Sequence, residues 1–196
     1  MAAPASKTTA NLNGKWVLNK TLSDPTDPAL ALQGVGWLVR KGIGAATITI
    51  TVKQYADAET GTTHIDIDQS ASGLSSTREQ RALDWSVREH KDWIFGAVKG
   101  QSKFVSRADL AALVGDEGGE ARKERWVNSD FLALDWEGGD GGDLILSHVV
   151  ADAGWFATQV WGFQDVGGER RYVRNVVVAK GDKFENFKMV YDFISE

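Results

Sequence analysis

Short segments that alternate apolar and polar residues recur along most of this chain, and they constrain its fold more than any other feature. Residues 46–55 place Ile48, Ile50 and Val52 between threonines, and residues 63–69 alternate isoleucine with aspartate. An alternation of period two is typical of a strand with one face in the core and one in solvent. The pattern predicts about ten short strands, at 13–19, 46–55, 63–69, 77–85, 93–105, 125–136, 143–150, 155–165, 169–180 and 183–193.

The even spacing of these segments predicts how the strands are connected. Helical patterns occur only at 28–42 and 107–114, so there is no repeated helix between strands, as a parallel sheet would need. We therefore expect a mainly β protein, an antiparallel up-and-down β-barrel of about ten strands. Closure removes exposed edges, and a barrel of this size has room for a small ligand. One domain is expected over 11–196, with 1–10 a disordered tail of small residues.

The first helical pattern predicts a short helix-turn-helix lid in front of the strand at 46–55. Asp27 is a good N-cap for a helix over 28–34, and the glycines at 34–36 favour a turn. A second helix over 37–42 is expected to end at Gly42, next to basic residues.

Apolar lid residues are the first candidate ligand contacts. Leu30, Val35, Val39 and Ile43 fall near one face at helical spacing, with Trp37 among them. Functionally they would line the entrance to a cavity. The alternative is that they only cap the core of the barrel.

Two strands near the C-terminus carry a second candidate set on single faces: Trp155, Ala157, Gln159, Trp161 and Phe163 on one, and Phe187, Met189 and Tyr191 on the other. Gln159 and Tyr191 would supply directional hydrogen bonds inside an otherwise apolar cavity. In the alternative interpretation these faces form an aromatic core, with Gln159 on a wetter patch.

A charged and aromatic segment at 84–93 contains the best catalytic candidate, His90. An imidazole titrates near neutrality and serves as a general base, and Asp84, Glu89 or Asp92 would orient it. The alternative is a solvated turn between strands, held by ion pairs.

Composition excludes several function classes. The net charge is −5 without a basic block, so nucleic acid is not an expected partner, and no apolar run predicts stable membrane insertion. There is no cysteine, and the three histidines lack metal-ligand spacing, so neither a metal nor a cofactor is expected. A cytoplasmic location is expected, because residues 1–10 do not resemble a secretory signal. The sequence leaves the oligomeric state open.

Three segments, taken in their order along the chain, resemble the intracellular fatty-acid-binding protein family of the calycin group. Gly14-Lys15-Trp16 resembles its first strand, LQGVGWLVRK at 32–41 its helix-turn-helix, and residues 45–48 the strand that follows. The resemblance implies a lidded barrel with an apolar cavity. Met189 stands two residues before Tyr191, where the family often has the arginine that holds a carboxylate. The chain is longer than usual around 105–150, and a lipocalin-like fungal branch is implied.

Three functions follow from these observations. The first is intracellular binding of a hydrophobic small molecule, lipid-like or a secondary metabolite, in the barrel. The alternative is a cofactor-free isomerase, cyclase or dehydratase that acts on an apolar biosynthetic intermediate in the same barrel, since a fold does not fix a function. A third is a partner-binding module with a filled interior.

Overall fold

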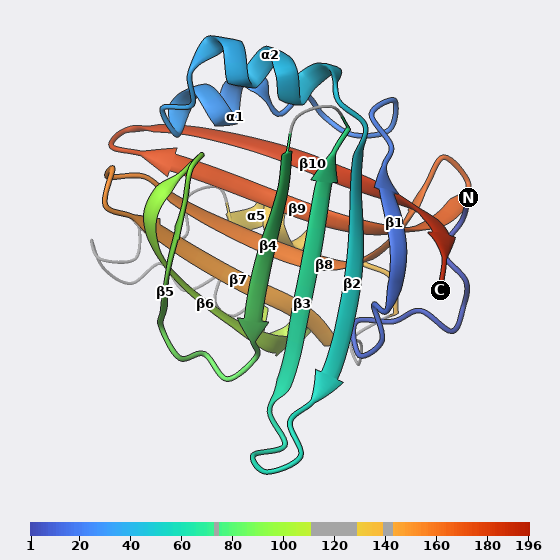
Figure 1. Ribbon diagram of the computed structural model, residues 1–196. Helices are drawn as coiled ribbons and strands as arrows, with labels where there is room; N and C mark the ends of the chain where they lie inside the picture. Colours follow the sequence, from blue (N-terminus) through green and yellow to red (C-terminus); the bar gives the residue numbers. More distant parts are fainter. Residues whose placement is uncertain (73–74, 111–128, 139–142) are drawn as a thin grey trace.

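The computed structural model describes residues 1–72, 75–110, 129–138 and 143–196, and it contains one ten-stranded antiparallel sheet (Figure 1). The strands are β1 Gly14–Leu18, β2 Ile48–Ala56, β3 Thr63–Ala71, β4 Ser75–Ala82, β5 Arg88–Asp92, β6 Gly96–Ser106, β7 Asp143–Ala151, β8 Phe156–Val166, β9 Glu169–Lys180 and β10 Lys183–Ser195. Each of the ten predicted strand segments except 125–136 overlaps one of these strands.

The sheet is wound up and down, as the spacing of the segments predicts. Its strand order is β4-β3-β2-β1-β10-β9-β8-β7-β6-β5, so β1 and β10 pair and β4 and β5 are the two edges. Figure 1 shows the sheet curled into a barrel, with β2–β4 in front and β7–β10 crossing behind. The edges β4 and β5 are not hydrogen-bonded to each other, so the barrel is open between these two strands. Just beyond β4, the Trp85 N–H donates to the Ser102 carbonyl of β6 at 2.9 Å, so the two ends of the sheet meet there.

The interior at one end of the barrel is filled by aromatic and branched side chains. Trp16 is fully buried and contacts Tyr172 and Phe193, with ring centroids 5.3 and 4.9 Å apart. Ile50, Val52, Ile65 and Ile67 belong to the same cluster, so the predicted alternation on β2 and β3 places its apolar face inward. This end of the barrel is a packed core.

Strand β9 is buried on both faces because part of the long insertion covers the outside of the barrel. A second cluster joins Val173 and Val177 of β9 to Leu110, Leu132 and Trp136. Helix α5, Ser129–Ala133, supplies Leu132, so the expected strand over 125–136 is wrong at these residues. The remainder of the insertion, at 111–128 and 139–142, lies outside the described residues, as does part of the expected helix over 107–114.

The lid consists of two short helices, α1 Asp27–Leu32 and α2 Trp37–Ala45, as expected (Figure 1). Gly34 has a φ of 86°, which explains a glycine at the turn between them. Two details differ from the prediction. Asp27 is the first helical residue rather than the N-cap and pairs with Arg40, and α2 continues past Gly42 because Ala46 N–H bonds the Gly42 carbonyl.

The N-terminal residues differ from the disordered tail that we expected. Ala3 N–H donates to the Arg170 carbonyl at 2.7 Å, and the Thr9 hydroxyl donates to the Asp143 carbonyl at 2.8 Å. Lys7 is only 2% exposed, and its Nζ lies 2.7 Å from Glu196. The N-terminal segment therefore packs against the end of the barrel, where its polar groups find hydrogen-bond partners. The composition of the segment does not reveal these contacts.

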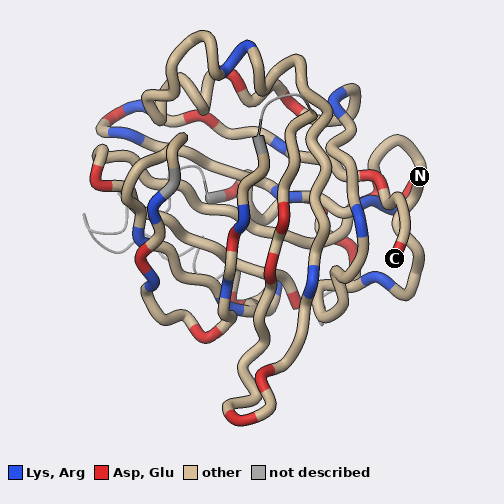
Figure 2. The backbone as a smooth tube through the Cα atoms, viewed as in Figure 1, with Lys and Arg blue, Asp and Glu red and all other residues tan. Residues whose placement is uncertain are grey.

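Charged residues are interspersed over the strands rather than gathered in one basic region (Figure 2). Strand β4 carries two basic residues and one acidic residue, Arg78, Glu79 and Arg81. In the part of the chain that the structure describes, the helices are too short or too polar for a transmembrane span.

Candidate functional site

A buried arginine lies at the centre of the barrel's inner wall. The register aligns Trp161 of β8, Arg174 of β9 and Met189 of β10, so all three share the inward face. The Arg174 guanidinium lies 4.0 Å from the centroid of the Trp161 ring and 5.3 Å from that of Tyr191. Its Nε donates to the Tyr172 hydroxyl at 2.9 Å. A cation is therefore held among aromatic faces, an arrangement that stabilises it by cation–π attraction.

A second arginine reaches the same tryptophan from the opposite edge of the sheet. The Arg81 guanidinium of β4 lies 5.0 Å from the Trp161 ring centroid. It donates to Ser147 Oγ of β7 and to Glu79 Oε2, each at 2.7 Å. We call Glu79, Arg81, Trp161, Tyr172, Arg174 and Tyr191 the guanidinium–aromatic cluster. It joins β4 to β8, β9 and β10 across the barrel.

The protonation states of the cluster follow from burial and charge. Burial raises the pKa of Tyr172 to about 12 despite the Arg174 charge, and burial also raises the pKa of Tyr191. Burial alone would raise the pKa of Glu79, but the charges of Arg81 and Arg174 outweigh it and the pKa is lowered. Near neutral pH the tyrosines keep their O–H groups, and Glu79 is a carboxylate.

Two N–H positions in the cluster are without an acceptor among the described residues: Nε of Arg81 and one terminal nitrogen of Arg174. A buried donor left without a partner costs roughly 1–3 kcal/mol, more when it is charged. Such donors are suited to an oxygen atom of a bound molecule.

Solvent reaches the interior next to the cluster. Gln159, Met189 and Phe104 are on inward faces by register but are only half-buried, and the Glu79 side chain is 36% exposed. Towards the lid, the interior is apolar, with Trp155, Val176, Val178 and Phe187 packed near Ala29 of α1. The arrangement therefore combines an apolar wall with a small set of polar donors, as in typical small-molecule sites.

Four candidate residues from the sequence lie on this wall, as their alternation predicts. Gln159 and Trp161 share a face, and the Trp161 indole N–H donates to Gln159 Oε1 at 2.9 Å. Met189 and Tyr191 share the neighbouring face of β10, with the tyrosine hydroxyl 3.7 Å from the methionine sulfur. Their contact with a ligand stays a prediction.

The lid candidates divide into two groups. Val35 is buried, and Leu30, Val39 and Ile43 are half-buried, which suits residues on the inner side of a lid. Trp37, the first residue of α2, is 62% exposed, so its side chain faces solvent and not the interior of the barrel. Its contact with a ligand stays a prediction.

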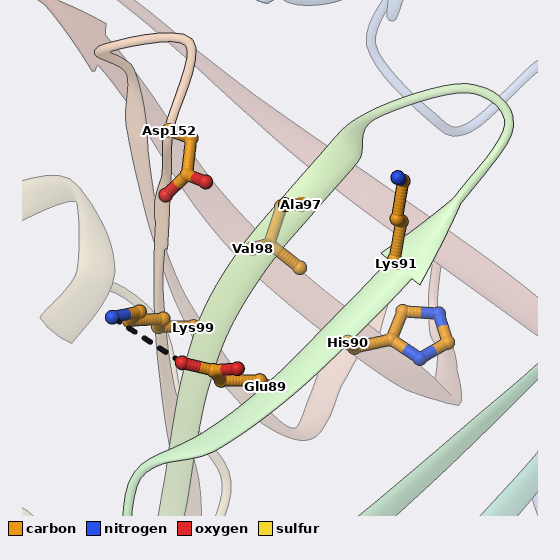
Figure 3. Close-up of a pocket in the computed structure, with 7 residues that line it drawn as sticks. All are labelled: Glu89, His90, Lys91, Ala97, Val98, Lys99 and Asp152. Carbon is orange, nitrogen blue, oxygen red and sulfur yellow. Dashed lines mark ion pairs between the residues drawn. The ribbon is translucent and has the colours of Figure 1, made fainter.

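His90 lies on β5 and lines a pocket of about 340 Å³ (Figure 3), together with Glu89, Lys91, Ala97, Val98, Lys99 and Asp152. Two of the three expected orienting residues, Asp84 and Glu89, have other partners. Arg88 donates twice to Asp84, at 2.7 Å each, and holds the pKa of that carboxyl well below its usual range. Glu89 pairs with Lys99 at 3.4 Å. These ion pairs favour the solvated interpretation of the segment, and a general-base role for His90 stays a prediction.

Sequence reasoning missed Glu79, Arg81, Tyr172 and Arg174. The signal was present in the alternation: Arg174 falls between Tyr172 and Val176 at a spacing of two, on the same face of a strand. A charged residue at an inward position of a β-barrel marks a polar site, because an unpartnered buried charge is costly.

Comparison with known proteins gives two relatives along the whole chain and no matching family model. The chain is 28% identical over 194 residues to a probable pericyclase, scpY of Mollisia scopiformis, covering 98% of this chain and 95% of the relative. It is 26% identical over 197 residues to the pericyclase pydY of Acremonium sp, covering 99% and 97%.

Solved structures share the architecture at low sequence identity. Lipid binding protein 8 of Caenorhabditis elegans matches with a TM-score of 0.53 at 12% identity, covering 93% of this chain and 94% of that one. The fluorescent protein UnaG gives a TM-score of 0.52 at 13% identity, covering 93% and 97%. The extracellular fatty acid binding protein As-p18 gives 0.52 at 12% identity, covering 96% and 100%. The chain therefore has the lidded, ten-stranded β-barrel fold of the fatty-acid-binding proteins within the calycin group.

Proposed function

We propose that this protein encloses a hydrophobic small molecule in its barrel and promotes a pericyclic ring closure of that molecule. The observation that carries the proposal is the guanidinium–aromatic cluster inside an otherwise apolar, solvent-accessible barrel. The full-length similarity to two proteins named pericyclases supports the same reaction class.

A pericyclic closure places modest demands on a protein. In a [4+2] closure, for example, three π bonds become one π bond and two new σ bonds, and no atom leaves or enters. The protein must fold a flexible chain so that its two reacting ends meet. Holding reacting groups in the right geometry accounts for several kcal/mol of a barrier in favourable cases. An apolar wall with aromatic faces such as Trp155 and Trp161 suits that task.

The cluster would supply the electronic part. A carbonyl conjugated with one reacting π bond becomes more electrophilic when it accepts a hydrogen bond. Within the cluster, the terminal N–H of Arg174 and the Nε–H of Arg81 have no acceptor among the described residues, and the charge on each strengthens such a bond. Because the guanidiniums are held by Trp161, Tyr172 and Ser147, they need little reorganisation when the substrate arrives.

Binding without turnover is the second candidate, and the fold favours it. Solved neighbours include a lipid binding protein and a fatty acid binding protein, and both functions share the same binding step. Only turnover separates them.

A two-stage experiment tests the proposal. Tryptophan fluorescence is first titrated with fatty acids, retinoids and polyketides, and we expect at least one dissociation constant below about 100 μM, or about −5.5 kcal/mol. Linear trienes with an activated carbonyl are then incubated with the protein, and cyclised isomers are separated by chromatography. We expect faster closure or an altered isomer ratio relative to buffer and to the unfolded protein.

Each stage has its own contradicting outcome. Absence of any binding in the first stage would contradict the binding proposal. Binding with an unchanged closure rate and isomer ratio for every triene would leave the binding function and refute the catalytic one. A cytoplasmic location is part of the proposal and would be tested by fractionation of cells that express the tagged chain.

A further inference from the structure

We propose that Glu79 is a specificity-determining residue: it cancels the charge of Arg81 and leaves Arg174 as the one uncompensated cation of the cluster. The cavity would then select a ligand with a single anionic or strongly accepting oxygen group. This inference rests on the proposed function, because it requires an apolar molecule in the barrel.

The alternation on β4 places Glu79 and Arg81 together on the inward face. They contact each other at 2.7 Å, and Glu79 is opposite Ile67 of β3, which belongs to the interior core. Arg78 is on the outward face and has its own acidic neighbours there, Asp66 at 3.1 Å and Asp68 at 3.8 Å. Glu79 therefore serves the interior cations and is not part of the outer ion pairs.

Arg174 lacks a carboxylate at bonding distance in the described part of the chain. Its hydrogen bond goes to the neutral Tyr172 hydroxyl, and its other close neighbours are rings. Glu79 influences it through space, as it does the Tyr191 hydroxyl. The described cluster thus contains two guanidiniums and one carboxylate, and its net charge is one positive unit.

The position of Glu79 also makes its charge effective. It is half-buried at the edge strand of the open side, close enough to His90 of β5 for that imidazole to lower its pKa. Charges interact more strongly in such an environment than in bulk water. Loss of this carboxylate would double the net charge seen by a ligand head group, so anions would gain relative to neutral molecules, by about tenfold.

The test compares two fluorescent probes with the same hydrocarbon chain, the anionic cis-parinaric acid and its uncharged methyl ester. Dissociation constants are measured for the wild type, for Glu79→Gln and for Asp68→Asn. Asp68 lies on the outer face of the same wall and is 65% exposed, so its variant removes one negative charge outside the barrel. We expect Glu79→Gln to raise the preference for the acid over the ester about tenfold, and Asp68→Asn to change it less than twofold.

A double variant separates charge balance from disturbed packing. Glu79→Gln with Arg81→Gln removes the pair together, so the preference for the acid should return to within about twofold of the wild type. A preference that stays unchanged in Glu79→Gln while both probes still bind would overturn the charge role of Glu79 and leave the proposed function standing. Failure of the wild type to bind either probe would instead count against the proposed function itself. Thermal unfolding of each variant checks that the measured protein is folded.

Discussion

Replacement of Arg174 by methionine should weaken ligand binding strongly while changing the stability of the fold little. Arg174 is 5% exposed, and methionine fills a similar length without a charge. The substitution removes a cation–π contact with Trp161, about 1–2 kcal/mol, and a hydrogen bond to Tyr172, about 1–1.5 kcal/mol. It also removes the cost of burying a cation that has no bonded carboxylate, which is several kcal/mol.

These contributions have opposite signs and similar size. We therefore expect the free energy of unfolding to change by less than about 2 kcal/mol in either direction. Urea unfolding followed by tryptophan fluorescence measures this change. Affinity for cis-parinaric acid should fall at least tenfold in the same variant, or about 1.4 kcal/mol, because the ligand loses its charged donor.

Arg170→Met is the matched comparison. The Arg170 guanidinium stacks on Phe163 at 3.8 Å, pairs with Glu137 and donates to the Lys7 carbonyl at 2.9 Å. It holds the N-terminal segment to the end of the barrel, so its loss should cost about 2–4 kcal/mol of stability with little effect on probe affinity. A loss of more than about 3 kcal/mol in Arg174→Met, with probe affinity retained, would refute the view that Arg174 is kept for binding.

Three further substitutions test separate parts of the structure. Gly162→Ala should lower the free energy of unfolding by about 1–3 kcal/mol, because a Cβ there would lie 2.6 Å from a neighbouring leucine methyl. Gly100→Ala is the control: its Cβ would meet its nearest atom at 3.6 Å, so this variant should lose little stability. Chemical unfolding compares the two variants. The lowered pKa of Glu79 means that its stabilisation is complete above its ordinary value of 4.5 and is lost as pH falls through the folded pKa. Stability of Glu79→Gln should therefore fall less steeply below pH 4.5 than that of the wild type in acid titrations. Asp27→Ala removes the 3.1 Å contact with Arg40 between α1 and α2, and should speed amide exchange in the lid without a change in global stability. Equal exchange rates would show that this contact does not hold the lid.

Most strands were predictable because one of their faces is buried and the other is exposed to solvent. Where that contrast is missing, prediction failed. Strand β5, Arg88–Asp92, is polar on both faces because it is an edge strand on the open side of the barrel, so it resembled a charged turn. The sequence predicts a strand over 125–136, whereas residues 129–133 form α5, because their apolar side chains pack on the outside of the barrel, a surface that most barrel sequences leave polar. Tertiary packing decided both segments, and local pattern did not.

The candidate site was predictable in its apolar part and not in its charged part, for a reason that lies in the register. A resemblance between sequences compares residues along the same strand. Met189, in place of the family's arginine, therefore predicts that no cation lies beside Tyr191. In the barrel, however, the residue opposite Met189 is Arg174 on the neighbouring strand. The interior therefore keeps a guanidinium within 5.3 Å of the Tyr191 ring, supplied by β9 in place of β10. Neighbouring inward positions of an antiparallel sheet are interchangeable as sources of a charge because their side chains meet over the same patch of wall. Arg81 of β4 is a second cation at the same place, and its charge is balanced by Glu79. The sequence does not predict this ion pair as part of the site, because Arg81 meets Trp161 only when the curl of the sheet brings the edge strand β4 over β8.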